Sequence, residues 1–172
     1  AEKLGVDLKA VDLAILSHGH YDHGGGLRAF CHWNDTAKIY LRKDAFGEYV
    51  ALEEDGSLRY IGLDPTLQAY ADRLVFTEER AQPDEELLLF SDVPDSYGAL
   101  SASAKLKERQ GANLLQDRFL HEQDLLITAE GKTVLVSGCS HRGIVNILSR
   151  ARALAAGEID AMIGGFHLFQ LE

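Results

Sequence analysis

Residues 18–23 crowd three histidines and an aspartate into one short stretch, directly after the apolar run 11–16. These potential metal ligands are His18, His20, Asp22 and His23. Imidazoles held this close lower one another's pKa, and a carboxylate beside them would sit in a partly dry cleft, unless a cation takes up their lone pairs. The segment therefore predicts a strand that ends at a metal site. The glycines at 24–26 are expected to give the backbone room to turn past the ion.

The length and charge of the chain narrow the classes of protein it can belong to. With 172 residues, 46% of them hydrophobic, the chain has the size of one domain and can bury a core. Its 17 basic and 27 acidic residues give a net charge of −10, which repels nucleic acid and anionic membranes. We therefore expect a small-molecule substrate as the partner, with no nucleic acid and no membrane.

The lengths of the apolar runs and the positions of the cysteines indicate where in the cell the protein is located. No apolar run reaches the ~20 residues that span a bilayer. The two cysteines, Cys31 and Cys139, lie in different segments and form no disulfide framework. The cysteines favour a reducing compartment, and the short apolar runs favour a soluble protein. We therefore expect a cytoplasmic protein.

The N-terminal half alternates short apolar strands with less patterned segments. The run 13–16 predicts a strand buried on both faces, because it is continuously apolar. The spacing of Leu27, Phe30 and Cys31 predicts a helix over 27–33. Further strands are expected at 39–41, 74–76 and 87–90. The segment 43–63 is expected to be a helix-loop insertion, and 91–111 a loop.

The C-terminal third has a clearer pattern. Two strands are expected at 124–128 and 133–137, joined by a turn at Glu130-Gly131-Lys132. Apolar residues at helical spacing predict an amphipathic helix over 144–156, and a further strand is expected at 159–163. This order of strand, helix and strand indicates a parallel crossover and therefore a mixed α/β fold.

Two more histidines follow predicted strands, where the chain runs into glycine. His141 lies in the segment 137–143 and His167 lies in the segment 163–167. Ligand sites in α/β sheets lie at the carboxyl ends of strands, so we expect both histidines to join the cluster. His121 precedes a strand and fits this rule less well. Arg142 is either a phosphate-binding residue or part of a surface salt bridge.

At this point the chain resembles the metallo-β-lactamase superfamily, whose signature His-x-His-x-Asp-His stands here at residues 18–23. The segments 138–146 and 164–168 are similar to a subgroup related to dihydropterin ribofuranosyl-aminobenzene 5'-phosphate synthase. The resemblance extends from Leu4 to Leu168. It implies a four-layer αββα sandwich with a two-metal site between its sheets.

The resemblance also assigns ligands by position. His18 and His20 correspond to ligands of the first metal, and Asp22, His23 and His167 to ligands of the second. His121 and His141 remain alternatives for the third ligand of the first metal. Cys139 matches a position that bridges or binds metal elsewhere in the family. Relatives begin ahead of the signature strand and continue past His167, so the resemblance implies that residues 1–172 are the central portion of such a domain, incomplete at both ends.

This site chemistry predicts a metal-dependent hydrolase. Two divalent ions, zinc first with iron or manganese as alternatives, would activate a hydroxide for attack on a small anionic or phosphorylated metabolite. We expect Asp22 and His141 to be the catalytic residues. Two other interpretations stay open: a mononuclear iron dioxygenase of thiols or persulfides, and a metal-binding fragment without turnover.

Overall fold

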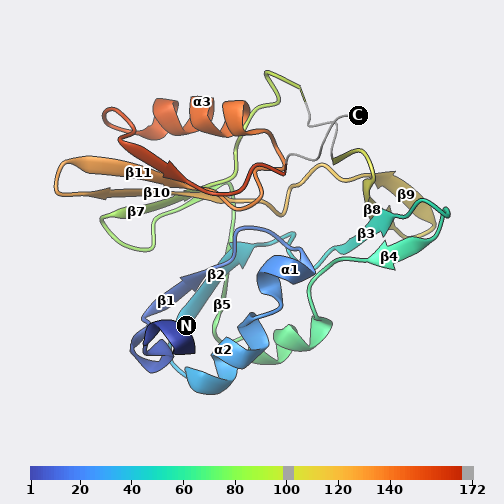
Figure 1. Cartoon of the computed structure of the whole chain (residues 1–172), viewed down its shortest axis with the longest axis horizontal. Coiled ribbons are helices and arrows are strands. Elements are labelled where there is room, and N and C mark those ends of the chain that lie inside the picture. Colours follow the sequence, from blue (N-terminus) through green and yellow to red (C-terminus); the bar gives the residue numbers. More distant parts are fainter. Residues whose placement is uncertain (99–102, 168–172) are drawn as a thin grey trace.

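The computed structural model describes residues 1–98 and 103–167. Its first sheet is built from the N-terminal half of the chain. This sheet has the order β1-β2-β5, with both pairs parallel (Figure 1). Its strands are β1 (Leu13–Ile15), β2 (Lys38–Arg42) and β5 (Leu74–Thr77). The strand β1 lies at the sheet edge and is half-buried, so the expectation of burial on both faces was wrong.

Short helices accompany this first sheet. They are η1 (Glu2–Leu4), η2 (Leu8–Ala10), α1 (Tyr21–Gly24), α2 (Leu27–Trp33) and η3 (Pro65–Tyr70). Leu27 of α2 and Leu67 of η3 pack with Leu41 of β2 in one apolar cluster. The predicted helix over 27–33 is therefore confirmed, and it covers the outer face of the sheet.

The second sheet carries most of the C-terminal third. Its order is β12-β11-β10-β7-β6. The strands are β6 (Arg80–Ala81), β7 (Leu87–Phe90), β10 (Asp124–Ala129), β11 (Lys132–Val136) and β12 (Ala161–Ile163). The pair β10 and β11 forms the expected hairpin, and β11 and β12 are parallel, as the crossover predicts. The connecting helix α3 (Ile144–Leu154) packs on this sheet through Ile147 and Ala151 (Figure 1).

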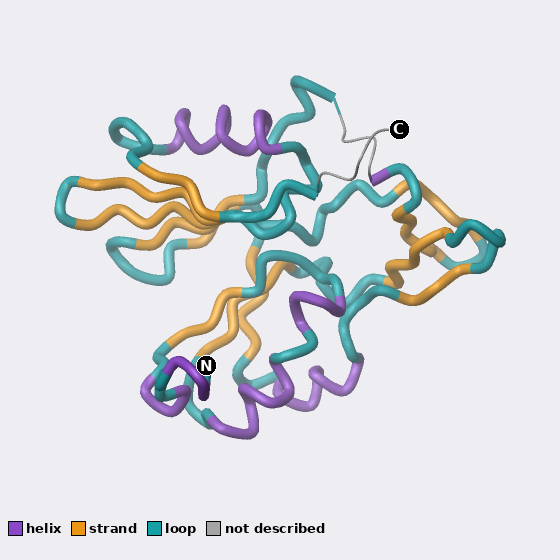
Figure 2. The backbone as a smooth tube through the Cα atoms, viewed as in Figure 1, coloured by secondary structure: helices purple, strands orange, loops and turns teal. Residues whose placement is uncertain are grey.

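A third sheet projects to one side of the molecule and was not predicted (Figure 2). It is antiparallel, with the order β4-β3-β8-β9. Its strands are β3 (Glu48–Leu52), β4 (Leu58–Tyr60), β8 (Leu106–Gln110) and β9 (Asn113–Gln116). The predicted helix-loop insertion at 43–63 was therefore wrong. The predicted loop at 91–111 was wrong over residues 106–110, which form β8. The strands β4 and β9 are exposed along their length, so they lack the apolar alternation that marks a half-buried strand.

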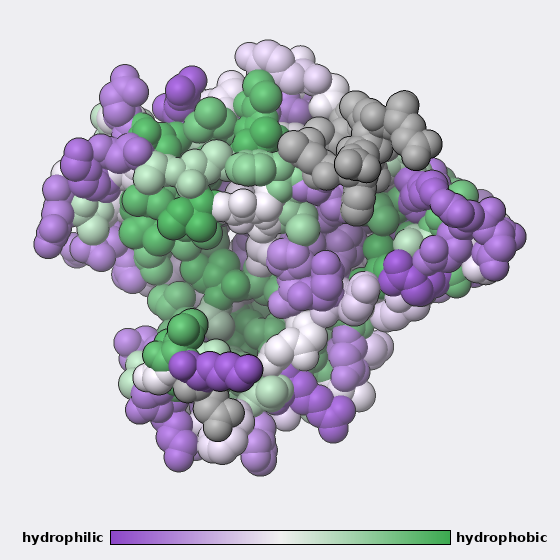
Figure 3. All heavy atoms as spheres, viewed as in Figure 1, coloured by the Kyte–Doolittle hydropathy of each residue, from purple (hydrophilic) through white to green (hydrophobic). Residues whose placement is uncertain are grey.

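The order of the layers is helix, sheet, sheet and helix, with the first and second sheets facing each other (Figures 1 and 2). The predicted mixed α/β fold class is confirmed. Hydrophobic side chains line a hollow between the two sheets (Figure 3), where a cavity of about 510 Å³ is bordered by Ile15, Leu16, Leu125 and Val136. Within the described residues, every helix is too short or too polar to cross a membrane.

Candidate metal centre

The loop that leaves β1 buries two histidines at the edge of the hollow. His18 is fully buried and His20 is 4% exposed. The hydroxyl of Ser17 lies 3.0 Å from Nδ1 of His18, so it orients that ring. The other nitrogen of His18, Nε2, is buried and has no hydrogen-bond partner in the described part of the chain, and Nε2 of His20 is in the same condition. The loop thus presents two buried ring nitrogens that form no hydrogen bond with the described residues, although Nε2 of His20 lies 3.7 Å from a carboxylate oxygen of Asp117.

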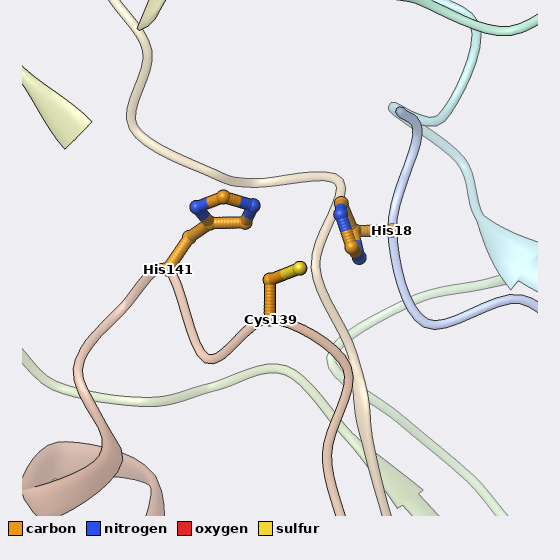
Figure 4. A group of neighbouring side chains, drawn as sticks. All are labelled: His18, Cys139 and His141. Atoms are coloured by element: carbon orange, nitrogen blue, oxygen red, sulfur yellow. The ribbon is translucent and has the colours of Figure 1, made fainter. Parts of the chain in front are cut away.

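The loop that leaves β11 brings Cys139 and His141 to the same place (Figure 4). Their approach depends on Gly138, because a Cβ there would lie 2.4 Å from the hydroxyl oxygen of Ser17. The ligand atoms of His18, Cys139 and His141 lie within 4.8 Å of one another. Two strand exits from opposite sheets therefore meet at one cluster, as the rule for α/β sheets predicts.

The donor set suits a divalent cation. Both ring nitrogens of His141 are buried without a hydrogen-bond partner among the residues that the structure describes. Burial lowers the pKa of His141 to about 2, and burial and the neighbouring histidines also lower the pKa of His18. Both rings are therefore neutral near pH 7 and present lone pairs to the cluster. Leaving such nitrogens without a partner is costly, and a metal ion would remove that cost.

Asp22 and His23 lie at the solvent side of the cluster. The side chains of His23 and Asp22 are 31% and 56% exposed, and the closest nitrogen and oxygen of the pair are 4.0 Å apart. A carboxylate oxygen of Asp22 lies within 4.8 Å of ligand atoms of His18 and His20. The thiol of Cys139 lies 3.1 Å from Nε2 of His23. Burial raises the pKa of this thiol to about 11, so it is protonated while no cation is bound.

His121 is buried beside the cluster but has both nitrogens engaged. Nδ1 accepts a hydrogen bond from the backbone N–H of Gly19 at 2.9 Å. The proton therefore lies on Nε2, which is 3.1 Å from a carboxylate oxygen of Asp117. With this tautomer His121 supports the loop of His18 and His20, whereas His141 offers free nitrogens. The geometry favours His141 over His121 as the candidate ligand that joins His18 and His20.

His167 follows β12 and reaches the cluster from the second sheet. Its ring centroid lies 4.3 Å from that of His141. On the other side of His141, the ring of Phe119 stacks at 4.6 Å with an interplanar angle of 6°. The structure therefore brings together all eight residues that the sequence suggested as ligands: His18, His20, Asp22, His23, His121, Cys139, His141 and His167.

Three buried carboxylates around the cluster were missed by sequence reasoning. Asp117 forms a ligand group with His20 and His121, all within 4.8 Å. Glu122 accepts hydrogen bonds from the backbone N–H groups of His141 at 2.7 Å and Arg142 at 2.9 Å. Asp124 is also buried, and burial raises the pKa of both Glu122 and Asp124. The polar run 121–124 before an apolar strand was a signal for them, since charged residues are rarely buried without a role.

Several expectations about nearby residues need correction. The guanidinium of Arg142 donates to the backbone oxygens of Ser91 and Val93, so it is neither free for a phosphate nor part of a surface salt bridge. Gly143 precedes α3 as its N-cap. Gly24 packs against Leu63, since a Cβ there would lie 2.2 Å from that side chain. Its small size therefore serves the core of the first sheet and not clearance at the metal.

Comparisons with known proteins agree with this geometry. A family model described as the metallo-beta-lactamase superfamily matches residues 1–151. The crystal structure of Tm1679, described as a metal-dependent hydrolase of the beta-lactamase superfamily, superposes with a TM-score of 0.80 at 30% identity. The match covers 100% of this chain and 62% of Tm1679.

Two curated proteins of Methanocaldococcus jannaschii are also similar. An uncharacterized protein is 34% identical over 166 residues, or 91% of this chain and 58% of that protein. A protein named 7,8-dihydropterin-6-methyl-4-(beta-D-ribofuranosyl)-aminobenzene-5'-phosphate synthase is 28% identical over 187 residues, or 98% of this chain and 60% of that protein. The chain therefore spans about three fifths of the length of these relatives.

Proposed function

Because the chain belongs to the metallo-β-lactamase superfamily, we propose that it is a metal-dependent hydrolase with two divalent cations, preferably zinc, acting on a small anionic metabolite. The observation that carries this proposal is the set of buried imidazole nitrogens on His18, His20 and His141 that form no hydrogen bond with the described residues. They come from loops of two different sheets, and a cation would satisfy them together.

The residues divide between two positions in this proposal. His18, His20 and His141 would hold the first cation, and Asp22, His23 and His167 the second, with Cys139 between them. Cations held there would lower the pKa of a bound water toward about 7 and polarise a carbonyl or phosphoryl oxygen of the substrate. Imidazole-rich ligation favours zinc, while iron and manganese remain compatible with the carboxylate.

The remaining residues prepare the ligands for that role. The hydroxyl of Ser17 fixes the ring of His18, and Glu122 fixes the backbone at His141 through two N–H groups. His121 links Asp117 to the backbone of Gly19 and so holds the loop of His18 and His20. Asp22, which is exposed, can accept a hydrogen bond from a water at the site and orient it toward the substrate. Partners of this kind fix the orientation and basicity of metal ligands.

The class of substrate rests on similarity. A relative 28% identical over 98% of this chain is named as a synthase of a compound that carries a 5'-phosphate. We propose that this chain also acts on a compound that carries a phosphate. We do not propose the same pterin compound, because a similar fold does not fix the substrate. A phosphorylated metabolite also fits the expectation of a small-molecule partner in place of a nucleic acid.

The test is the metal content of purified protein, measured by mass spectrometry without added metal and after zinc loading. We expect about two equivalents in the parent and a loss of at least one in His20→Ala and in His141→Ala. His32→Ala, which removes an exposed histidine of α2, is the matched control and should equal the parent. Unchanged metal in both site variants would refute the ligand assignment.

The same samples separate the proposal from its alternatives. Hydrolysis of 4-nitrophenyl phosphate or of an ester panel should follow metal content across the variants. One equivalent of iron, with oxygen uptake in the presence of a persulfide, would instead support the dioxygenase. Bound metal without turnover on any of these compounds would support a metal-binding fragment.

A further inference from the structure

A second cavity has His141 in its wall and shares no lining residue with the hollow between the sheets. Its volume is about 530 Å³, and Ser103, Arg118, Phe119 and His141 are among its lining residues. His141 therefore belongs both to the wall of this cavity and to the ligand cluster. A substrate in this cavity would have one end at the proposed metal site and the other end among polar side chains.

Arg118 is an exposed arginine in the cavity wall whose guanidinium is unused. Within residues 1–98 and 103–167 it has neither an ion pair nor a hydrogen bond, whereas Arg80 and Arg150 both pair with Asp92. Arg142, which lines the same cavity, has its guanidinium bound to two backbone oxygens. Among the described residues, the guanidinium of Arg118 is therefore available to an anion that enters this cavity.

Ser103 supplies an independent observation in the same wall. Its side chain is 2% exposed, and its hydroxyl has no hydrogen-bond partner among the described residues. A buried hydroxyl without a partner costs about 1 to 3 kcal/mol, because it gives up its hydrogen bonds to water. A bound ligand with acceptor oxygens would restore that hydrogen bond.

We propose that Arg118 and Ser103 form an anion subsite, which binds the phosphate or carboxylate group of the substrate while its reactive bond lies at His141. A guanidinium binds such groups through two parallel N–H donors, and the hydroxyl adds a third donor. The placement of the reactive bond rests on the proposed function, but the anion subsite itself does not. The subsite would make the enzyme selective for substrates with a charged group some distance from the reacting atom.

Two carboxylates also line this cavity, and their negative charge affects how well an anion can bind there. Asp117 is turned to His121 and to the backbone N–H of Phe119, so its charge is already compensated. Asp95 is exposed, and its charge would oppose an anion nearby. Removing Asp95 should therefore strengthen anion binding, which distinguishes an anion subsite from one that binds a cationic group.

The test is calorimetric titration with phenyl phosphate, benzoate and inorganic phosphate, on the metal-free and the zinc-loaded protein. In both states Arg118→Gln should weaken phenyl phosphate binding about 10- to 100-fold, as expected for a charge-assisted hydrogen bond. Ser103→Ala should weaken it about 2- to 10-fold, and Asp95→Asn should tighten it. Arg152→Gln, which removes an exposed arginine of α3 outside the cavity, is the matched control and should equal the parent.

The outcomes separate this inference from the proposed function. Equal affinity of Arg118→Gln and the parent in both states, or tighter binding by Arg118→Gln, would overturn the subsite even if zinc binds as proposed. Loss of affinity in Arg118→Gln without any zinc binding by the parent would support the subsite and refute the metal centre. A larger loss for phenyl phosphate than for benzoate would identify a phosphate ester as the ligand, and the reverse would identify a carboxylate.

Discussion

His121 and His141 show how neighbouring buried histidines can take different parts in one site. His121 accepts from Gly19 and donates to Asp117, whereas both nitrogens of His141 remain without a partner in the described structure. From sequence the two were alternatives for the same ligand position. The tautomer of His121, and not its distance from the cluster, separates them.

Asp117 accepts a hydrogen bond from His121, which in turn holds the backbone of Gly19. This arrangement gives a prediction for a single residue. Burial favours the neutral form of Asp117, but the hydrogen bond from His121 outweighs it and holds the pKa of this carboxyl below its ordinary value. Asp117→Asn replaces the charged acceptor with a weaker one, so it should lower zinc affinity about 10- to 100-fold, the usual effect of losing a partner of a metal ligand. Competition with a chelating dye measures it. Asp35→Asn, an exposed control, should match the parent, and equal affinity in Asp117→Asn would contradict the support role.

At the scale of elements, α3 is held to the second sheet by a small apolar contact. Ile147 is fully buried against Phe90, Leu126 and Leu135, while Val145 of the same helix is 55% exposed. Ile147→Ala should lower the free energy of unfolding by about 2 to 5 kcal/mol, because it removes buried methylene groups and leaves a cavity. Val145→Ala should change it by less than about 0.5 kcal/mol. Urea denaturation measures both, and similar losses in the two variants would contradict this packing.

Asp92 ties α3 to β6 and gives the fold a dependence on pH. Burial raises the pKa of this carboxyl, but hydrogen bonds from Arg150 and Arg80 outweigh it and lower the pKa from its ordinary value of 3.8 to about 2. Because the pKa is lower in the folded state, this stabilisation is complete above about pH 4 and is lost as the pH falls toward 2.

The corresponding variant is Asp92→Asn. It should cost about 1 to 3 kcal/mol near pH 7, since three charge-assisted hydrogen bonds from Arg80 and Arg150 are weakened, and the difference from the parent should shrink below pH 4. Chemical denaturation over a pH series measures the difference. A constant difference from pH 7 to pH 2.5 would show that the ion pairs do not stabilise the fold, and Asp72→Asn is the exposed control.

The elements that sequence could predict are those with an apolar signal. Strands β7, β10 and β11 are rich in leucine, valine and isoleucine, and the structure has all three where they were expected. Strands β4 and β9 were missed because they are exposed throughout and stabilised by pairing to β3 and β8. Pairing between distant segments leaves no trace in the local sequence.

The same limit applies to the site at the scale of the whole molecule. The cluster at residues 18–23 was evident because its ligands are adjacent in sequence, and His141 and His167 followed from the rule on strand ends. Asp117 and Glu122 were not predicted, because each is a single carboxylate whose partners come from other segments of the chain. Their role depends on burial, which only the folded chain provides.

A cation shared by loops of both sheets should also stabilise the whole molecule. It binds the folded chain, where the loops of β1 and β11 meet, much better than the unfolded chain. Zinc at about 100 times its dissociation constant should add about 2.7 kcal/mol to the free energy of unfolding. Scanning calorimetry with zinc and then with a chelator measures this gain, which His141→Ala should lose. Equal gains in parent and variant would mean that zinc binds elsewhere.

The central claim is that imidazoles from two sheets hold metal ions at one cluster, and anomalous diffraction at the zinc edge tests it most directly. In crystals grown with zinc, the account predicts an anomalous peak about 2.0 to 2.1 Å from Nε2 of His18 and of His20 and from a ring nitrogen of His141. A second peak is expected about 3.5 to 4 Å from the first, on the side of Asp22 and His23. Zinc peaks only at surface residues, or none at the cluster under saturating zinc, would contradict the account.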